Sequence, residues 1–327
     1  MEQRYVGRSG LRVSRLGLGT MTWGRDTDEH EARDMLLTFR AAGGTLLDTA
    51  AGYADGDSEC VIGRLLGGVV AREEVVLATK GGISRRTGAR VVDVSRRTLL
   101  AELDGSLRRL GTDHVDLWQV HSWSDQVPVE ETLAALDTAV HSGRARYAGV
   151  SNYSGWQTAY AATWQRCWPG RAGLVSTQVE YSLLARGVER EVLPAAGALG
   201  LGVLAWSPLG RGVLTGKYRT GTPADSRGAS PHFADFVGRY LDGRSRRIVD
   251  AVVTAADGLG VSPVDVALAW VRDRPGVSAA IVGARTAAQL RGSLTCEQVD
   301  LPAEIRAALD DVSAPELGYP ERPPHRP

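Results

Sequence analysis

The sequence predicts an α/β protein of the (β/α)8 or TIM-barrel class, with one domain over residues 1–327. Two observations indicate this fold. Short apolar runs alternate with longer helical patterns from residue 15 to residue 294, a rhythm typical of βα units and a parallel sheet. The chain has 327 residues, which lies within the range of one such barrel and above the usual size of a single sandwich or bundle.

Eight apolar runs are the expected strands, and eight βα units in a chain of this length close most simply into a barrel. In chain order we expect strands at Arg15–Gly19, Thr45–Asp48, Val75–Lys80, Val115–His121, Ala145–Ser151, Leu174–Gln178, Gly202–Trp206 and Val277–Val282. Between the strands, apolar residues recur at spacings of three and four, often after Ser, Asp or Pro, as in helices. The expected helices include Glu29–Ala42, Ser95–Leu110, Val129–Ser142, Val188–Leu199, Arg244–Leu259 and Pro263–Arg274.

Three segments fall outside this repeat. Residues 4–13 have the pattern of an N-terminal hairpin that turns around Arg8-Ser9-Gly10. Ser207–Gly243, after the seventh strand, is long, Gly-rich and irregular, as functional or disordered insertions in compact domains are. The tail over residues 313–327 contains five prolines, so we expect it to be irregular.

The charge balance excludes several classes of partner. The chain has 38 basic and 38 acidic residues, so neither nucleic acid nor an anionic membrane is an expected partner. No run approaches the roughly 18 apolar residues of a membrane span, and residues 1–4 do not begin an apolar signal core. We therefore expect a cytoplasmic protein with a small-molecule substrate, while its oligomeric state stays open.

Cysteines and histidines give no sign of a disulfide or a metal centre. Cys60, Cys167 and Cys296 lie far apart and form no C-x-x-C pair. None of the six histidines lies in an H-E-x-x-H motif. We therefore expect free thiols and no metal.

Four polar residues cluster after three consecutive predicted strands, where barrel enzymes have their active sites. Asp48 ends the second strand with Tyr53 shortly after it, Lys80 ends the third and His121 the fourth. A phenol titrates near ~10, and an adjacent ammonium group lowers that value. We expect Lys80 to lower the pKa of Tyr53, Asp48 to keep Lys80 charged, and His121 to polarise the oxygen that Tyr53 protonates. Singly, each residue fits a cap or a packing position, but together they favour proton transfer.

Scarce residue types mark some of the same positions. Lysine occurs only at Lys80 and Lys217, and asparagine only at Asn152. A coding bias accounts for the scarcity, because a solvated cation can usually be either Lys or Arg. The positions that kept Lys or Asn are therefore candidates for chemistry that requires these side chains.

Several segments together resemble the aldo-keto reductase family. They are Asp48–Tyr53, Ala78-Thr79-Lys80, Gln119-Val120-His121, Gly149-Val150-Ser151-Asn152 and Trp206–Gly212. The resemblance implies a (β/α)8 barrel that reduces carbonyl groups with NADPH, and a catalytic tetrad of Asp48, Tyr53, Lys80 and His121. Relatives that reduce a conjugated C=C bond carry Glu in place of this histidine. His121 thus favours carbonyl reduction, with a 2,3-unsaturated keto-sugar still open.

The resemblance also implies an NADPH site. Its members are Ser151, Asn152 and Gln178 at the carboxamide, Trp206 on the nicotinamide ring, Thr20, Ser207, Leu209, Gly212, Lys217 and Arg227 around the phosphates, and Gly283, Arg285 and Gln289 at the adenosine end. The fork of Arg285 suits the 2′-phosphate, whereas Arg227 fits a solvated surface equally well. Gly292 and Ser293 stand where the family usually has Glu and Asn, so we expect weaker adenine recognition.

The substrate is less defined. Trp23 and Trp123 are expected in the pocket wall, where aromatic rings suit the less polar face of a sugar, although a general aldehyde pocket fits the same residues. Met21–Asp28 and the Arg-rich composition resemble the actinobacterial branch of the family that acts on nucleotide-activated keto-deoxysugars in antibiotic biosynthesis. The alternatives are a broad aldehyde and ketone reductase or an NADPH-binding regulatory protein like channel β subunits, which can lose the histidine.

Overall fold

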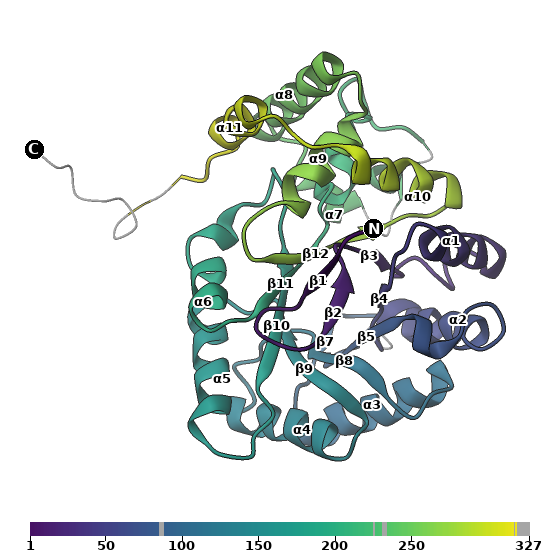
Figure 1. The fold of residues 1–327 in the computed structure, drawn as a ribbon, viewed down its shortest axis with the longest axis vertical. Helices are drawn as coiled ribbons and strands as arrows, with labels where there is room; N and C mark the ends of the chain where they lie inside the picture. The colour runs from purple at the N-terminus through teal and green to yellow at the C-terminus, as the bar shows by residue number, and fades with distance from the viewer. Residues whose placement is uncertain (85–87, 225, 231–233, 317, 319–327) are drawn as a thin grey trace, which may run out of the picture.

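Eight parallel strands form a closed barrel in the computed structural model, which describes residues 1–84, 88–224, 226–230, 234–316 and 318 (Figure 1). They are β3 (Leu16–Gly19), β4 (Leu46–Asp48), β5 (Val76–Gly81), β8 (Val115–Val120), β9 (Ala145–Ser151), β10 (Leu174–Glu180), β11 (Gly202–Trp206) and β12 (Val277–Gly283). Each strand pairs with the next along the chain, and β12 closes the ring on β3 with Gly283 opposite Gly19. The predicted fold class is confirmed.

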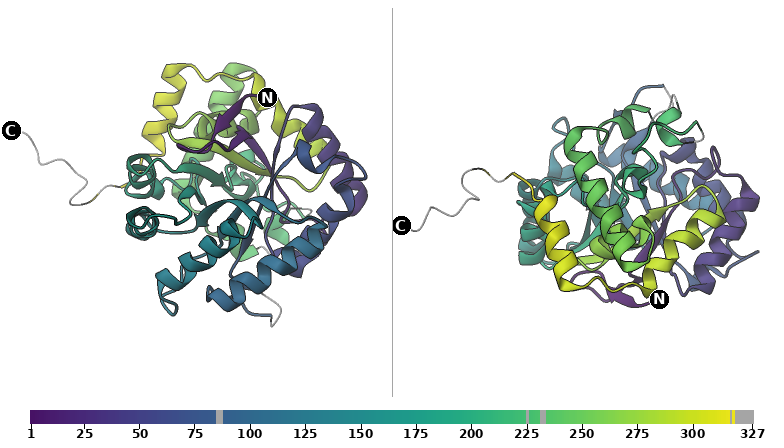
Figure 2. Two further views of the ribbon diagram at one scale, coloured as in Figure 1. Left: turned by 60° about the horizontal axis from the view of Figure 1, so that its bottom comes forward. Right: turned by 90° about the horizontal axis from the view of Figure 1, so that it is seen from above.

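Helices surround the barrel (Figure 2). They are α1 (Glu29–Ala41), α2 (Asp57–Leu65), α3 (Arg96–Leu110), α4 (Val129–His141), α5 (Gly155–Cys167), α6 (Val192–Ala198), α7 (Ala234–Gly238), α8 (Gly243–Leu259), α9 (Pro263–Arg272), α10 (Ala287–Leu294) and α11 (Ala303–Val312). Side chains of Asp28, Ser154 and Ser262 accept hydrogen bonds from the first turns of α1, α5 and α9. These polar caps explain why the helices begin where they do.

No described helix by itself is long and apolar enough to cross a membrane. The pair α8 and α9 meets that criterion only when the two are taken together, and they are bent by 103°.

The segments outside the repeat follow the expectation in part. The N-terminal hairpin is present as β1 (Gln3–Tyr5) paired with β2 (Arg12–Ser14). The insertion Ser207–Gly243 contains α7 and short 3-10 turns, and its residues 225 and 231–233 lie outside the described residues. Residues 317 and 319–327 of the tail also lie outside them. A second hairpin, β6 (Ile83–Ser84) with β7 (Val91–Val92), was not expected.

The hairpin at the N-terminus closes one end of the barrel. Val6, Leu11 and Val13 are buried and pack with the interior residues Leu46 and Leu117 in one apolar cluster. Burial of these side chains stabilises the closed end by roughly 1.5–3 kcal/mol each. The polar side chains of the strand ends therefore gather at the opposite end.

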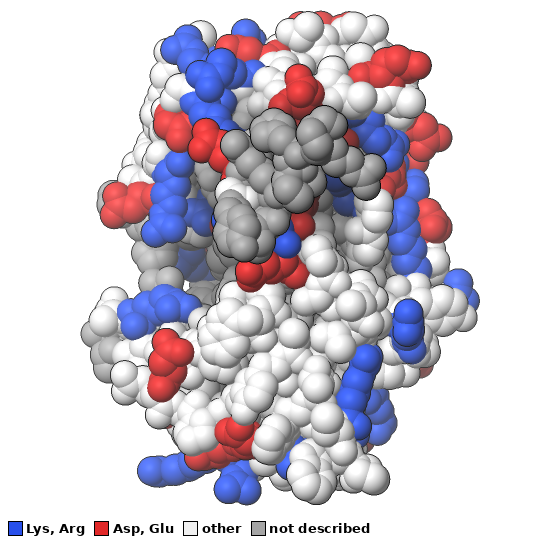
Figure 3. All heavy atoms as spheres, turned by 90° about the vertical axis from the view of Figure 1, so that its left-hand side faces the viewer, with Lys and Arg blue, Asp and Glu red and all other residues white. Residues whose placement is uncertain are grey.

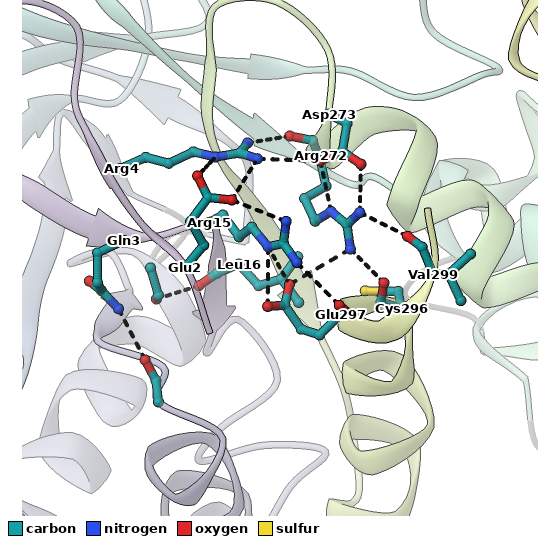
Figure 4. A network of polar contacts seen from close by, with 12 residues as sticks. Glu2, Gln3, Arg4, Arg15, Leu16, Arg272, Asp273, Cys296, Glu297 and Val299 are labelled. Atoms are coloured by element: carbon teal, nitrogen blue, oxygen red, sulfur yellow. Dashed lines mark hydrogen bonds and ion pairs between the residues drawn. The ribbon is translucent and has the colours of Figure 1, made fainter. Parts of the chain in front are cut away.

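Arg4 of the hairpin donates to the carbonyl of Arg272 at the end of α9, and so connects this closed end to the helices behind it (Figure 4). Arg272 is 0% exposed, and it donates to Asp273 and to the backbone carbonyls of Cys296 and Val299. Arg15 binds Glu297 with an N···O distance of 2.9 Å. A buried charge of this kind is tolerated only when it is paired and hydrogen-bonded. The network therefore stabilises the end of the barrel opposite the carboxyl ends of the strands.

Gly63 on α2 provides a test of the packing. A Cβ at Gly63 would come within 2.2 Å of the carbonyl oxygen of Arg109 on α3, whereas a Cβ at Gly258 on α8 would enter open space. We expect Gly63→Ala to lower the free energy of unfolding by about 1–3 kcal/mol. The control Gly258→Ala should be neutral or stabilising by up to about 1 kcal/mol. Urea unfolding measures both, and equal effects would contradict the packing described here.

Candidate active site

The four polar residues that follow or end β4, β5 and β8 lie together at the carboxyl-terminal end of the barrel strands. Asp48 ends β4, Lys80 lies near the end of β5 and His121 directly follows β8. Because β4, β5 and β8 are neighbours in the barrel, their carboxyl ends lie side by side. Tyr53 lies in the turn after β4.

Lys80 and Asp48 form a buried ion pair. The Nζ of Lys80 lies 2.7 Å from Oδ2 of Asp48 and also donates to the carbonyl of Thr49 at 2.9 Å. The other carboxylate oxygen of Asp48 accepts from the side-chain amide of Gln178 at 2.7 Å. Burial alone would lower the pKa of Lys80, but the charge of Asp48 and the contact with Tyr53 outweigh it and raise that pKa. The ammonium group therefore stays charged inside the barrel.

Tyr53 lies against this pair and beside His121. Its Oη is 3.5 Å from Nζ of Lys80, and its ring meets the imidazole ring of His121 edge-on, with centroids 5.8 Å apart. Burial raises the pKa of Tyr53, and the nearby charge of Lys80 opposes this without reversing it. Lys80 thus acts on Tyr53 in the expected direction and lowers its pKa, but burial has the larger effect and the net shift is upward. The physical reason is that desolvation of a phenolate here exceeds the attraction of an ammonium whose shorter bonds go elsewhere.

The backbone after Tyr53 is strained. Ala54 and Asp55 have φ of 47° and 53°, and Gly56 has φ of 106°. A residue with a Cβ pays roughly 1–2 kcal/mol in this left-handed region. The turn directs the chain from β4 into α2 and holds the tyrosine over the strand ends, and strain of this kind clusters at functional sites.

Asn152 connects three strand ends. Its side-chain amide donates to the carbonyl of His121 at 2.9 Å and accepts from the indole N–H of Trp206 at 3.0 Å. Its backbone N–H donates to the carbonyl of Gln178 at 2.9 Å, as does the hydroxyl of Ser151. Asn152 has φ of 58°, which asparagine tolerates better than most residues. The side chains predicted at the carboxamide thus lie together, next to His121 and Asp48.

Four of the first six residues in the loop after β11 lie in the left-handed region. Ser207 has φ of 51°, Gly210 53°, Arg211 61° and Gly212 94°. A Cβ at Gly212 would lie 3.7 Å from Nζ of Lys217, so glycine leaves an open space in front of this exposed cation. Leu209 packs against the core below the loop.

Sequence reasoning missed Arg211, which anchors this loop. Its guanidinium forms a double hydrogen bond with Glu180 at 2.6 and 2.8 Å and lies 3.8 Å from the ring centroid of Phe236. Only 6% of its side chain is exposed. Among many arginines in a sequence with few lysines, nothing in the composition distinguishes this one.

Cations gather at the predicted adenosine end. A Cβ at Gly283 would lie 3.8 Å from the guanidinium of Arg227. Burial and the nearby charge of Arg285 lower the pKa of Arg227, while Asp26 opposes the shift. The charge of Arg285 thus acts on Arg227, and Arg227 is partly buried.

The other residues predicted at the adenosine end form hydrogen bonds within α10 and with the residues that flank it. The side chain of Gln289 accepts from the backbone N–H of Arg285 at 3.0 Å. Ser293 is buried and donates to the carbonyl of Gln289, while the carbonyl of Gly292 accepts from Thr295. Neither Gly292 nor Ser293 offers the carboxylate or carboxamide that the family usually places there.

Three other predicted residues differ in their exposure. Thr20 is fully buried, and its hydroxyl lies 3.1 Å from the carbonyl oxygen of Asp48 and 2.9 Å from the hydroxyl of Ser58. Trp23 is also 0% exposed and belongs to the core, so its ring does not form an open pocket wall. Trp123 is half-buried and donates to Asp125 at 2.7 Å, with its ring 5.3 Å from that of Trp156.

Cys60, Cys167 and Cys296 carry free thiols. Within the part of the chain that the structure describes, no group of three His, Cys, Asp or Glu side chains is arranged to hold a metal ion.

Comparison with known proteins places this geometry in a family. A model of the Aldo/keto reductase family matches residues 15–314. The chain is 39% identical to the uncharacterized oxidoreductase YrpG of Bacillus subtilis, over 95% of this chain and 96% of the relative. It is 36% identical to a probable voltage-gated potassium channel subunit beta of Oryza sativa, over 98% of each chain. It is 34% identical to L-glyceraldehyde 3-phosphate reductase of Escherichia coli, over 89% of this chain and 86% of the relative.

The buried ion pair gives a stability prediction. We expect Asp48→Asn to lower the free energy of unfolding by about 3–5 kcal/mol, because it leaves the ammonium of Lys80 buried without a counter-charge. The double variant Asp48→Asn/Lys80→Met should regain most of this loss, since it removes both charges. Chemical unfolding at neutral pH measures the three proteins. A double variant as unstable as the single one would show that the charge pairing is not the cause.

Proposed function

The chain belongs to the aldo/keto reductase family of oxidoreductases, and we propose that it reduces a carbonyl group with NADPH and with Tyr53 as the proton donor. The observation that carries this proposal is the placement of Tyr53 beside the buried Lys80–Asp48 pair and His121. A general acid must hold its proton until the substrate oxygen develops charge. Burial raises the pKa of Tyr53, and the charge of Lys80 opposes this rise, which favours release of the phenolic proton to a substrate.

The chain's own residues then have distinct tasks. NADPH, when bound, supplies the hydride that adds to the carbonyl carbon. Tyr53 donates its phenolic proton to the carbonyl oxygen, so that an alcohol forms, and it regains a proton from solvent. Lys80 stabilises the negative charge that appears on the Tyr53 oxygen, and Asp48 keeps Lys80 charged and fixed in direction. His121 borders the same space and orients the carbonyl oxygen towards Tyr53.

The residues at the strand ends fit NADPH. Ser151, Asn152 and Gln178 bring amide and hydroxyl groups together, which suits the donors and acceptors of a carboxamide. Trp206, whose orientation is fixed by its bond to Asn152, would stack on the nicotinamide ring. Lys217 in front of Gly212 would bind the pyrophosphate, and Arg227 with Arg285 the 2′-phosphate. Two guanidinium groups held close together repel each other, and a bound phosphate would offset that repulsion.

For the substrate we propose a small carbonyl compound, which would reach Tyr53 past the half-buried ring of Trp123. A nucleotide-activated keto-deoxysugar is a narrower proposal that rests on Met21–Asp28 and on Trp123 alone. Among the relatives described above, one is named as a reductase of L-glyceraldehyde 3-phosphate, which supports the broader proposal. Burial of Trp23 removes one of the two rings from which the sugar pocket was argued.

A second candidate function is an NADPH-binding regulatory subunit, which the similarity to potassium channel β subunits favours. Such a protein needs the cofactor site but not turnover. The presence of all four residues of the tetrad in one cluster supports turnover in this chain.

The proton donor can be tested directly. We expect Tyr53→Phe to abolish NADPH-dependent turnover and to change NADPH affinity by no more than a few-fold, because the substitution removes only the transferable proton. Turnover is measured with the best substrate from a panel of simple aldehydes and nucleotide-linked keto-deoxysugars, and affinity by fluorescence titration. Tyr5→Phe, an exposed position at the closed end of the barrel, is the control. Retained turnover in Tyr53→Phe would refute the assignment.

The preference for NADPH over NADH depends on the clustered arginines. We expect Arg285→Ala to raise the dissociation constant for NADPH by about 10- to 100-fold, the effect of losing a charge-assisted pair, and to leave that for NADH nearly unchanged. Arg291→Ala, which removes an exposed cation of the neighbouring helix α10, should change neither constant by more than about two-fold. An equal loss of affinity for the two cofactors in Arg285→Ala would contradict this placement of the 2′-phosphate.

A further inference from the structure

An aromatic stripe runs along the outer side of α5. Trp156, Tyr160 and Trp164 follow one another at intervals of four residues, and Trp168 comes directly after the helix. Trp156 is 59% exposed, Tyr160 41% and Trp168 57%. Residues four apart lie on the same side of a helix, so the four rings follow one line about 18 Å long, in which Trp164 is partly buried against the core.

This stripe is not the side of α5 that packs on the barrel. The buried residues of the helix are Gly155, Thr158, Ala161, Ala162 and Gln165, which occupy the opposite side. A helix on the surface of a protein ordinarily has one apolar side and one polar side. Because α5 already buries one side in the core, the fold of a single chain does not account for the exposure that Trp156, Tyr160 and Trp168 keep.

Beyond α5, the surface is poor in charge apart from the exposed Arg166, whose side chain donates to the carbonyl of Leu199 at the end of α6. The neighbouring helix α6 packs closely on α5 and has the sequence Val-Leu-Pro-Ala-Ala-Gly-Ala, without a charged residue. Figure 3 shows the side of the molecule on which α5 and α6 lie, and uncharged atoms cover the middle of its lower half with charges around them. Loss of charge from the centre and enrichment in Trp and Tyr are the compositional marks of a protein interface.

The charges beside the stripe have an order. Glu130 of α4 accepts a hydrogen bond from the hydroxyl of Tyr160 at 2.6 Å. One turn further along α5, the guanidinium of Arg171 lies 5.3 Å from the ring centroid of Trp164. An acid therefore accompanies the first of these two rings, and a base accompanies the second. Within one chain the charge of Arg171 already contributes to the lowered pKa of Glu130.

From this arrangement we infer that the aromatic stripe is the contact surface for a second copy of this chain, in a two-fold symmetric dimer with antiparallel α5 helices. The two-fold axis would cross α5 at right angles, midway between Tyr160 and Trp164. Tyr160 of one protomer then lies opposite the partner subunit's Trp164, and Trp164 lies opposite the partner subunit's Tyr160. The same operation sets Glu130 opposite the partner subunit's Arg171, twice in each dimer. An axis along α5 would instead set Glu130 against the partner subunit's Glu130.

Size and net charge agree with this arrangement. A standard interface takes about 800 Å² from each partner, which corresponds to a patch roughly 28 Å across. The aromatic stripe, about 18 Å long, would form the centre of such a patch. The surface of α6, which has no charged residue, would widen it on one side. With 38 basic and 38 acidic residues, two copies of the chain have no net charge to keep them apart.

Exchange of the two charges tests the dimer and its direction. Wild-type protein is expected to show a concentration-dependent dimer in analytical ultracentrifugation. Glu130→Arg and Arg171→Glu should each raise the dimer dissociation constant by about tenfold or more, because each sets two like charges against each other. A mixture of the two single variants should form a heterodimer with affinity within about threefold of wild type, because both facing pairs are then complementary.

The mixture separates the interface from effects inside one chain. Glu130→Arg also removes the bond to Tyr160, but that loss persists in the mixture and cannot restore association. Trp168→Ala is a second variant, with an expected rise of about tenfold or more in the dissociation constant, and circular dichroism checks that each variant is folded. Wild-type protein that stays monomeric at every concentration up to about 100 μM would overturn the proposal. Single variants that dimerise like wild type, or a mixture that fails to associate, would overturn the antiparallel arrangement.

Discussion

The site depends on a positive charge held inside the barrel. Moving an ammonium group from water into a protein interior costs several kcal/mol unless a counter-charge and hydrogen bonds replace the water. Lys80 has both, since Asp48 supplies the charge and the carbonyl of Thr49 a second acceptor. Asp48 in turn is fixed by Gln178 from the other side of the barrel. The position of Tyr53 relative to a cation therefore follows from a chain of contacts that crosses the barrel interior.

Packing at the closed end of the barrel and anchoring of the loop after β11 both support the end that holds Lys80 and Asp48. Apolar side chains of the N-terminal hairpin close the opposite end, and the buried Arg272 joins that end to α9 and its neighbours. The loop after β11 is fastened by Arg211, which pairs with Glu180 on β10 and packs on Phe236. Rigid packing below and anchored loops above leave the strand ends as the place where a ligand can be held.

The fold and the grouping of Asp48, Tyr53, Lys80 and His121 at one end of the barrel could be predicted from the sequence because they follow from patterns along the chain. The βα rhythm determined the eight strands, and the ends of the strands identified Asp48, Lys80 and His121 as neighbours. Features that depend on packing in three dimensions could not be predicted this way. The burial of Trp23 and the direction of the pKa shift of Tyr53 depend on how much water surrounding segments exclude. Arg211 differs from other arginines only through Glu180 and Phe236, which come from distant parts of the chain.

The bridge made by Asn152 has a consequence for how this barrel can change during evolution. One carboxamide joins the carbonyl of His121 to the indole of Trp206, so it links a residue of the tetrad with a residue expected at the cofactor. A substitution there alters both neighbours at once, and no other standard side chain both tolerates its backbone conformation and offers the same donor and acceptor at that length. Substitutions that change specificity are therefore expected in the loops around the barrel, because they leave the bonds of Asn152 to His121 and Trp206 unchanged.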